Sequence, residues 1–158
     1  MMAILAKFTV PQEALDVLQR MSGLQGGLDA MSSRVTEKIA RTAVKRVRRA
    51  ILQKMLDLAP ASPAWLAYKA RHGLDSRTLV ASKQYVQSMK AVRIDEKSWG
   101  VEADYDLYKF HEYGTKNMPA RPHWTPVLID MRGYIQTIFA REVDKVLSGN
   151  RAAESGEE

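Results

Sequence analysis

The side chains that could do chemistry in this chain are few, and their spacing matches no catalytic or metal-binding pattern. The three histidines are His72, His111 and His123, and the pair His111-Glu112 lacks the second histidine of a zinc-binding HExxH helix. Cysteine is absent, which excludes disulfides, thiolate metal sites and a cysteine nucleophile. The sequence therefore predicts no catalytic residue, no metal site and no cofactor, and the chain is not expected to be an enzyme.

Two further groups resemble sites but have simpler explanations. Asp104 and Asp106 flank Tyr105 and could hold a divalent ion, although capping of the next helix is the expected role. Gly26-Gly27 lacks the Lys-Ser/Thr pair and the strand–helix setting of a phosphate-binding loop. Neither group therefore predicts a metal ion or a cofactor.

The most specific stretch runs over residues 108–128, YKFHEYGTKNMPARPHWTPVL, which we call the signature segment. Gly114 follows an aromatic helix end and suits the left-handed residue that closes a helix. Pro119 and Pro122 fix φ on both sides of Arg121, so its guanidinium is held for pairing with a carboxylate, and Glu112 is the nearest candidate. Such a pair could pin a loop within one domain, lie at a subunit interface, or do both.

The order of these residues resembles a motif of the small neck or tail-completion proteins of long-tailed bacteriophages. The resemblance covers about twenty residues, from Phe110 to Pro126, and runs as an aromatic-Glu-aromatic-Gly-Thr unit, a short spacer, Met-Pro-Ala-Arg-Pro, and a proline before a long helix. Weaker similarity reaches upstream to Ala59-Pro60, but the loop at 59–82 departs from the family pattern. The interface or loop-pinning candidates within this segment are Glu112, Tyr113, Gly114, Pro119, Arg121, Pro122 and Trp124.

This resemblance implies a structural virion protein without catalysis, located at the neck or the head-proximal end of the tail. Proteins at that position form rings, usually six-fold, around the channel through which DNA leaves. The implied partners are other copies of the chain and neighbouring neck, head-completion and tail-tube or terminator proteins, with non-specific contact to DNA in the channel. A cap on the tail tube and an adaptor to the head connector both remain open as roles, with assembly in the host bacterial cytoplasm.

A basic amphipathic helix is expected over residues 28–58, with an apolar stripe at spacings of three and four from Leu28 to Met55 and Leu58. Its charged face could be solvated, could meet DNA phosphates, or could dock on an acidic surface or a neighbour's acidic tail. The residues of this face are Arg34, Lys38, Arg41, Lys45, Arg48 and Arg49. A small basic nucleic-acid-binding protein that uses the helix Arg34–Lys54 is therefore the alternative function.

A second candidate interface lies in the proline-rich stretch after Pro60. Trp65 and Tyr68 stand beside Lys69 on a short helix expected at 63–71. Exposed aromatics among basic residues can stack on single-stranded nucleic acid or anchor a protein interface. Burial over the sheet is the third interpretation.

Length and composition place the chain among single-domain proteins. Its 158 residues are 46% apolar, enough to build a core without staples. The net charge of +6 gathers in residues 1–60, which hold ten basic and five acidic side chains. The start lacks a signal-peptide pattern and no apolar run reaches the length of a membrane span, so we expect a soluble intracellular protein without membrane contact.

The fold expected from periodicity is α+β, with two long amphipathic helices packed on a small antiparallel sheet. Strands are predicted at 3–10, 90–96 and 99–103, and a helix that starts after Pro11 should end before the glycine breaks at 22–23 and 26–27. The second long helix should begin at His123 or Thr125 and reach Leu147. Residues 1–147 would form one tail-completion-like domain, and the small, acidic residues 148–158 would form a disordered tail.

Overall fold

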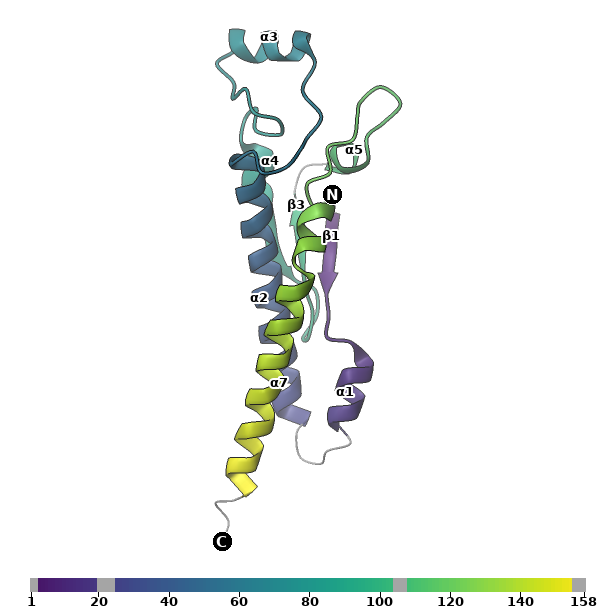
Figure 1. Ribbon diagram of the computed structural model, residues 1–158, viewed down its shortest axis with the longest axis vertical. Coiled ribbons are helices and arrows are strands. Elements are labelled where there is room, and N and C mark those ends of the chain that lie inside the picture. The colour runs from purple at the N-terminus through teal and green to yellow at the C-terminus, as the bar shows by residue number, and fades with distance from the viewer. Residues whose placement is uncertain (1–2, 20–24, 104–107, 155–158) are drawn as a thin grey trace.

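The computed structural model describes the backbone of residues 3–19, 25–103 and 108–154, and the side chains of 6–15, 27–103 and 108–148. Over these residues the fold mixes helices with a small antiparallel sheet, which confirms the predicted α+β class. The molecule is elongated, and the long helices α2 (Gln25–Leu52) and α7 (Arg132–Glu154) run along its length (Figure 1).

The sheet holds three strands in the order β1-β3-β2. Strand β3 (Trp99–Ala103) lies in the middle and pairs antiparallel with β1 (Ala3–Phe8) and with β2 (Lys90–Arg93). The last two strands form the predicted hairpin, whose turn is closed by the amide of Ile94 donating to the carbonyl of Ser98 at 2.9 Å. Helix α1 (Gln12–Gln19) follows Pro11, as expected for a helix that starts after proline.

Helix α2 covers the sheet with its apolar stripe, which is buried from Leu28 to Ile51. The predicted break at Gly26-Gly27 is wrong, because α2 already begins at Gln25. At Gly27 a Cβ would lie 3.6 Å from Val146 Cγ1, so the small residue fits a close approach between α2 and α7. Thr36 ties the helix to the hairpin by donating to the carbonyl of Lys97 at 3.0 Å.

The predicted end of this helix near Leu58 is also wrong. The helix stops at Leu52, Lys54 adopts a left-handed φ of 53°, and the amide of Met55 donates to the carbonyl of Ala50 at 2.9 Å. Met55 is consequently 62% exposed instead of lying in the core. The C-terminal carbonyl of Leu52 accepts a hydrogen bond from the Arg77 guanidinium at 2.9 Å, a contact that periodicity could not foresee.

The C-terminal half begins with α5 (Tyr108–Tyr113) and continues, after the signature loop, with α6 (Thr125–Asp130) and α7. Where one helix was predicted, α6 and α7 meet at Met131, and the amide of Ile135 still donates to the carbonyl of Met131 at 2.9 Å. Helix α7 packs on α2. It continues to Glu154, so the predicted boundary at Leu147 falls inside the helix, since extending a formed helix costs little.

Two short helices complete the chain. Helix α3 (Pro63–Arg71) matches the predicted range and is capped by Ser62 Oγ, which accepts from the amide of Trp65 at 3.2 Å. Helix α4 (Gln84–Ser88) leads into β2. Figure 1 shows α3 at one extremity of the molecule and the C-terminus at the other, with the loop after α5 beside α3. We call this extremity, formed by residues 59–83 and 114–120, the α3 end.

Candidate functional site

Glu112 organises the turn that leads into α6. Its carboxylate accepts the backbone amides of three consecutive residues: His123 at 3.0 Å, Trp124 at 3.1 Å and Thr125 at 2.8 Å. Burial opposes the ionisation of Glu112, yet the amide hydrogen bonds outweigh burial and hold its pKa below the usual value. The carboxylate therefore satisfies amides at the start of a helix that would otherwise be buried without partners.

His123 is fully buried beside this carboxylate. Its Nδ1 lies 2.8 Å from the carbonyl of Arg121 and 3.1 Å from Glu112 Oε2, and its Nε2 contacts the hydroxyl of Tyr85. Burial lowers the pKa of His123, against the opposing effect of its hydrogen bond to Arg121 and of Glu112, while burial raises the pKa of Tyr85. A neutral imidazole that donates from Nδ1 and accepts from Tyr85 fits these contacts, so the group joins α4 to the turn before α6.

Arg121 does not pair with Glu112, and the expected ion pair is absent from the described residues. The guanidinium instead donates to two carbonyls of the segment after α2, to Ala59 at 2.8 Å and to Pro60 at 2.9 Å. Its own amide donates to the carbonyl of His111 at 2.6 Å. Arg121 therefore joins the signature segment to residues 59–60, more than sixty positions earlier, because the three backbone amides already occupy Glu112.

Gly114 closes α5 in the left-handed region, as predicted. Its φ is +74°, and its amide donates to the carbonyl of Phe110 at 2.9 Å. A Cβ here would lie 2.7 Å from the amide nitrogen of Ala120 and 2.9 Å from the carbonyl oxygen of Met118. The loop beyond it is closed by paired hydrogen bonds between Thr115 and Met118. Glycine is therefore required at position 114 both by the left-handed φ and by the lack of room for a Cβ.

The remaining signature residues divide between surface and core. Tyr113 is 76% exposed, Pro119 and Pro122 are exposed, and Trp124 is buried. Tyr113 ends α5, and Pro119 and Pro122 lie in the segment that follows. The hydrogen bonds of the buried Glu112 and Arg121 fix the geometry of this segment. Such an arrangement suits contact with another protein, because little conformational entropy remains to be lost on binding.

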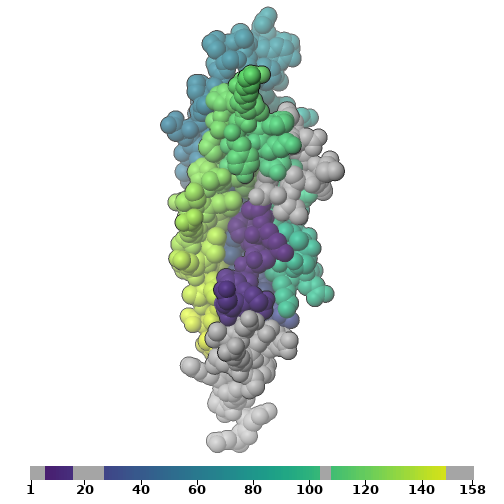
Figure 2. Space-filling model, turned by 90° about the vertical axis from the view of Figure 1, so that its right-hand side faces the viewer, coloured from purple at the N-terminus to yellow at the C-terminus, as the bar shows by residue number. Residues whose placement is uncertain are grey.

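Helix α3 presents aromatic rings to solvent at the same extremity. The Trp65 ring stacks on Tyr68 with centroids 5.1 Å apart, and the Tyr68 ring stacks on His72 with centroids 3.9 Å apart. Trp65 and Tyr68 are about two-fifths exposed, and Leu66 beside them is exposed too, so these rings are not buried over the sheet. Figure 2 shows the blue α3 segment and the green signature loop at one end of the molecule.

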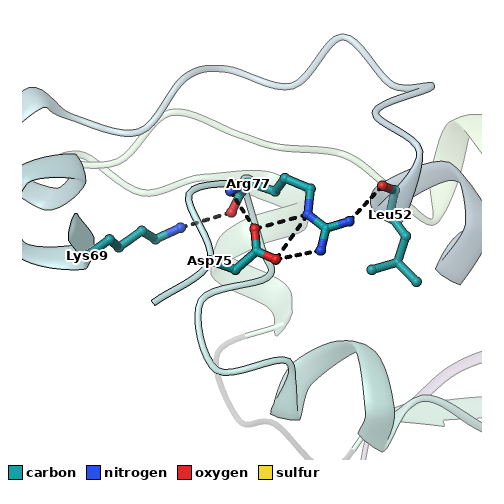
Figure 3. Close-up of polar contacts among 4 residues, drawn as sticks. All are labelled: Leu52, Lys69, Asp75 and Arg77. Carbon is teal, nitrogen blue, oxygen red and sulfur yellow. Dashed lines mark hydrogen bonds and ion pairs between the residues drawn. The ribbon is translucent and has the colours of Figure 1, made fainter. Parts of the chain in front are cut away.

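The prediction of Lys69 as an exposed interface residue is wrong, because this residue is only 2% exposed. Its ammonium donates to the carbonyl of Arg77 at 2.8 Å (Figure 3). Burial lowers the pKa of Lys69, Asp75 opposes that effect, and Arg121 adds to it. The stem of this lysine is part of the packing beneath α3.

Sequence reasoning missed the cluster that holds this lysine in place. Arg77 donates to both carboxylate oxygens of Asp75, from Nε at 2.9 and 3.1 Å, and it also reaches the carbonyl of Leu52 (Figure 3). Hydrogen bonds from Arg77 hold the pKa of Asp75 well below its usual value. The Asp-x-Arg spacing in a loop was the available signal, and with Arg121 this cluster fixes residues 59–83 to the end of α2.

Between α3 and the signature loop lies a hollow of about 640 Å³. Its walls come from three segments: residues 60–69, residues 78–85 and residues 111–121. Arg121, Lys69 and His111 line it together with Trp65 and Met118, so the hollow brings the signature segment and the aromatic helix to one place.

The basic face of α2 is smaller than predicted. Arg34, Lys38, Arg41 and Lys45 line one shallow depression with Glu37, and Glu37 pairs with Arg41 at 2.7 Å. Arg48 does not belong to this face, because it turns to the carbonyls of Gln87 and Met89 at the start of the sheet. Arg49 is exposed and contacts Gln53 at 2.8 Å, whereas Arg46, which was not predicted, pairs with Asp130 at 3.2 Å.

Among the described side chains, no group of three or more histidines and carboxylates is placed to hold a metal ion. The pair Asp104 and Asp106 and the acidic Glu157 and Glu158 lie outside the described residues. Within the described residues, none of the helices combines the length and apolarity needed to cross a membrane.

Comparisons of the chain with protein-family models, with curated proteins and with solved structures find no match.

Proposed function

We propose that this chain is a structural subunit of a tailed-phage virion, part of a ring at the neck or head-proximal end of the tail that completes the tail and helps to join it to the head. The observation that carries the proposal is the placement of the signature segment. Glu112, Gly114 and Arg121 hold its loop rigid beside exposed rings of α3, at one end of an elongated molecule.

The elongated shape supports this role. In the proposed architecture two long amphipathic helices, α2 and α7, form a rod with the small sheet, and the α3 end is presented at its tip. A ring requires head-to-tail contacts in which one patch meets a different patch of the next copy. The α3 end supplies one such patch, and the basic face of α2 supplies a second, separate one.

The exposed composition of the α3 end also favours a protein partner. Trp65, Leu66 and Tyr68 are exposed there, and Tyr113 is exposed at the adjoining end of α5. Aromatic anchors of this kind dominate the binding energy of protein interfaces. Six-fold stoichiometry, virion location and assembly with head-completion, tail-tube or terminator proteins belong to the same proposal.

Electron microscopy of particles produced with an early stop codon in this gene tests the proposal. We expect separate DNA-filled heads and free tails, and we expect the purified protein to rejoin them. Normally joined virions in the absence of the protein would refute the joining role.

A small nucleic-acid-binding protein is the second candidate, favoured by the depression that Arg34, Lys38, Arg41 and Lys45 line. That function requires tight DNA binding by the free chain, with affinity that falls steeply as salt rises. A ring subunit instead should bind DNA weakly at physiological salt. Titration of labelled duplex and single-stranded DNA at two salt concentrations separates the two candidates.

A further inference from the structure

The hollow at the α3 end has an asymmetric lining. Apolar surface comes from Trp65, Leu79, Met118 and the prolines, whereas every charged side chain in the lining is basic: Lys69, Lys83 and Arg121. Aspartate and glutamate do not contribute to it. Lys69 and Arg121 are buried and bind backbone carbonyls, whereas Lys83 is exposed. An apolar lining whose charged side chains are all basic is complementary to a ligand that is both apolar and acidic.

Backbone strain is concentrated in the same wall. Among the described residues, three that are not glycine have positive φ, and two of them, Leu79 at 65° and Lys83 at 62°, line the hollow. A bulky residue such as leucine adopts this conformation at a cost, and strained residues cluster where a surface is shaped for binding. Both strained residues belong to the lining segment 78–85.

The walls are also held rigidly from outside. Arg121 binds the carbonyls of Ala59 and Pro60 on one side, and Lys69 binds the carbonyl of Arg77 on the other. The Thr115–Met118 bridge closes the third wall. A hollow that keeps its shape without a ligand has a small ordering cost on binding.

We propose that this hollow binds an extended acidic peptide segment carrying one bulky apolar side chain, supplied by a protein other than this chain. The apolar side chain lies between Trp65 and Leu79, and a flanking carboxylate lies beside Lys83, the exposed one of the three basic lining residues. We assign the segment to another protein because the charged side chains of the lining are all basic and complement an acidic partner, whereas this chain carries a net charge of +6.

This inference deepens the proposed function and rests on it, since the segment would belong to a neighbouring virion protein. The volume of about 640 Å³ suits a few residues and not a whole domain. The hollow would thus recognise a short tail or loop of that neighbour, while the exposed rings of α3 contact the surface around it.

The test is selection of a random heptapeptide library on the immobilised full chain. We expect the enriched sequences to place aspartate or glutamate next to an aromatic or aliphatic residue. Binding of an enriched peptide should weaken about tenfold or more on Lys83→Glu, because one favourable charge becomes repulsive. Trp65→Ser, an exposed position, should weaken it comparably, and the matched control Lys45→Glu on α2 should leave it within about twofold.

Several outcomes would overturn the inference. These are the absence of enrichment, enrichment of neutral or basic sequences, and equal binding by the Lys83→Glu and Lys45→Glu variants. Self-association of the chain that Lys83→Glu abolishes would identify a second copy as the occupant and would also contradict it. Failure of peptide binding together with successful rejoining of heads and tails would refute this inference and leave the proposed function standing.

Discussion

Glu112 holds the backbone of the turn that leads into α6. Its carboxylate accepts three amides from residues 123–125, and hydrogen bonds to a charged acceptor are each worth more than neutral ones. We expect Glu112→Gln to lower the free energy of unfolding by about 2 kcal/mol, because the amide group accepts more weakly and brings an NH₂ that has no place there. Urea denaturation at pH 7.5 measures the change.

Glu37→Gln is the matched control, because Glu37 is a partly exposed carboxylate with one i,i+4 partner, Arg41. Its effect should stay within about 0.5 kcal/mol. The lowered pKa of Glu112 means that its contribution is present above the unfolded pKa and lost as pH falls through the folded one. Equal losses for the two variants would contradict the role given to Glu112.

The buried His123 and the half-buried His111 predict a second, earlier loss of stability in acid. Burial lowers the pKa values of His111 and His123 in the folded chain, so the unfolded chain takes up protons at higher pH than the folded chain. Stability should therefore be complete above pH of about 6.5 and fall below it, by up to about 1.4 kcal/mol per pH unit for each histidine. Denaturation at a series of pH values from 7.5 to 5 measures the slope.

Single and double variants apportion this slope. His111→Gln and His123→Gln should each remove part of it, and the double variant should be nearly flat between pH 7 and 5.5. Such variants lose stability at pH 7.5 as well, but the prediction concerns only the pH dependence. A slope that survives the double substitution would show that other groups produce it.

Alanine substitutions at Gly114 and at Gly133 should change the stability of the protein in opposite directions. Gly114→Ala should cost about 2 kcal/mol or more, because a Cβ would lie 2.7 Å from a backbone nitrogen at a φ of +74°. Gly133→Ala, in a helix with open space around the Cβ, should instead raise stability by up to about 1 kcal/mol. Thermal unfolding of both variants suffices, and changes of the same sign would argue against the loop geometry.

At the scale of elements, the sequence was most informative where one physical rule acted alone. The spacing of apolar residues predicts α2, and the alternation of residues 90–103 predicts the hairpin. Element ends were missed where a distant group decided them. The end of α2 depends on Arg77, which reaches back twenty-five residues to Leu52.

The contrast between local rules and distant contacts also explains which features of the candidate site the sequence predicts. The left-handed Gly114 follows from local chemistry and was predicted, whereas the partners of Glu112 and Arg121 depend on how segments meet in space. The sequence predicts surface positions for Arg48 and Lys69, since basic side chains usually lie there, but each charged group binds backbone carbonyls and Lys69 is buried. Pattern alone cannot distinguish these lysines and arginines from the exposed ones.

The docking of α3 depends on Arg121, and this dependence can be tested locally. Arg121→Lys keeps the charge but cannot bind the carbonyls of Ala59 and Pro60 with the same fork. We expect global stability to fall by about 1–2 kcal/mol and amide hydrogen exchange in residues 61–71 to quicken more than in α7. Arg34→Lys, at an exposed position on α2, is the control and should change neither; uniform acceleration of exchange would count against a local role.

At the scale of the whole molecule, the aromatic surface of α3 separates assembly from folding. Trp65 and Tyr68 are substantially exposed, so Trp65→Ser with Tyr68→Ser should change the free energy of unfolding by less than about 1 kcal/mol. If these rings anchor contacts in the proposed ring, the same double variant should rejoin heads and tails at least about tenfold less efficiently, as the loss of one interface anchor implies. Ile129→Ser, at another exposed apolar position on α6, is the matched control and should rejoin heads and tails as the wild type does.

Rejoining at the wild-type rate by the double variant would exclude α3 from the interface. The basic face of α2 would then be the surface to test.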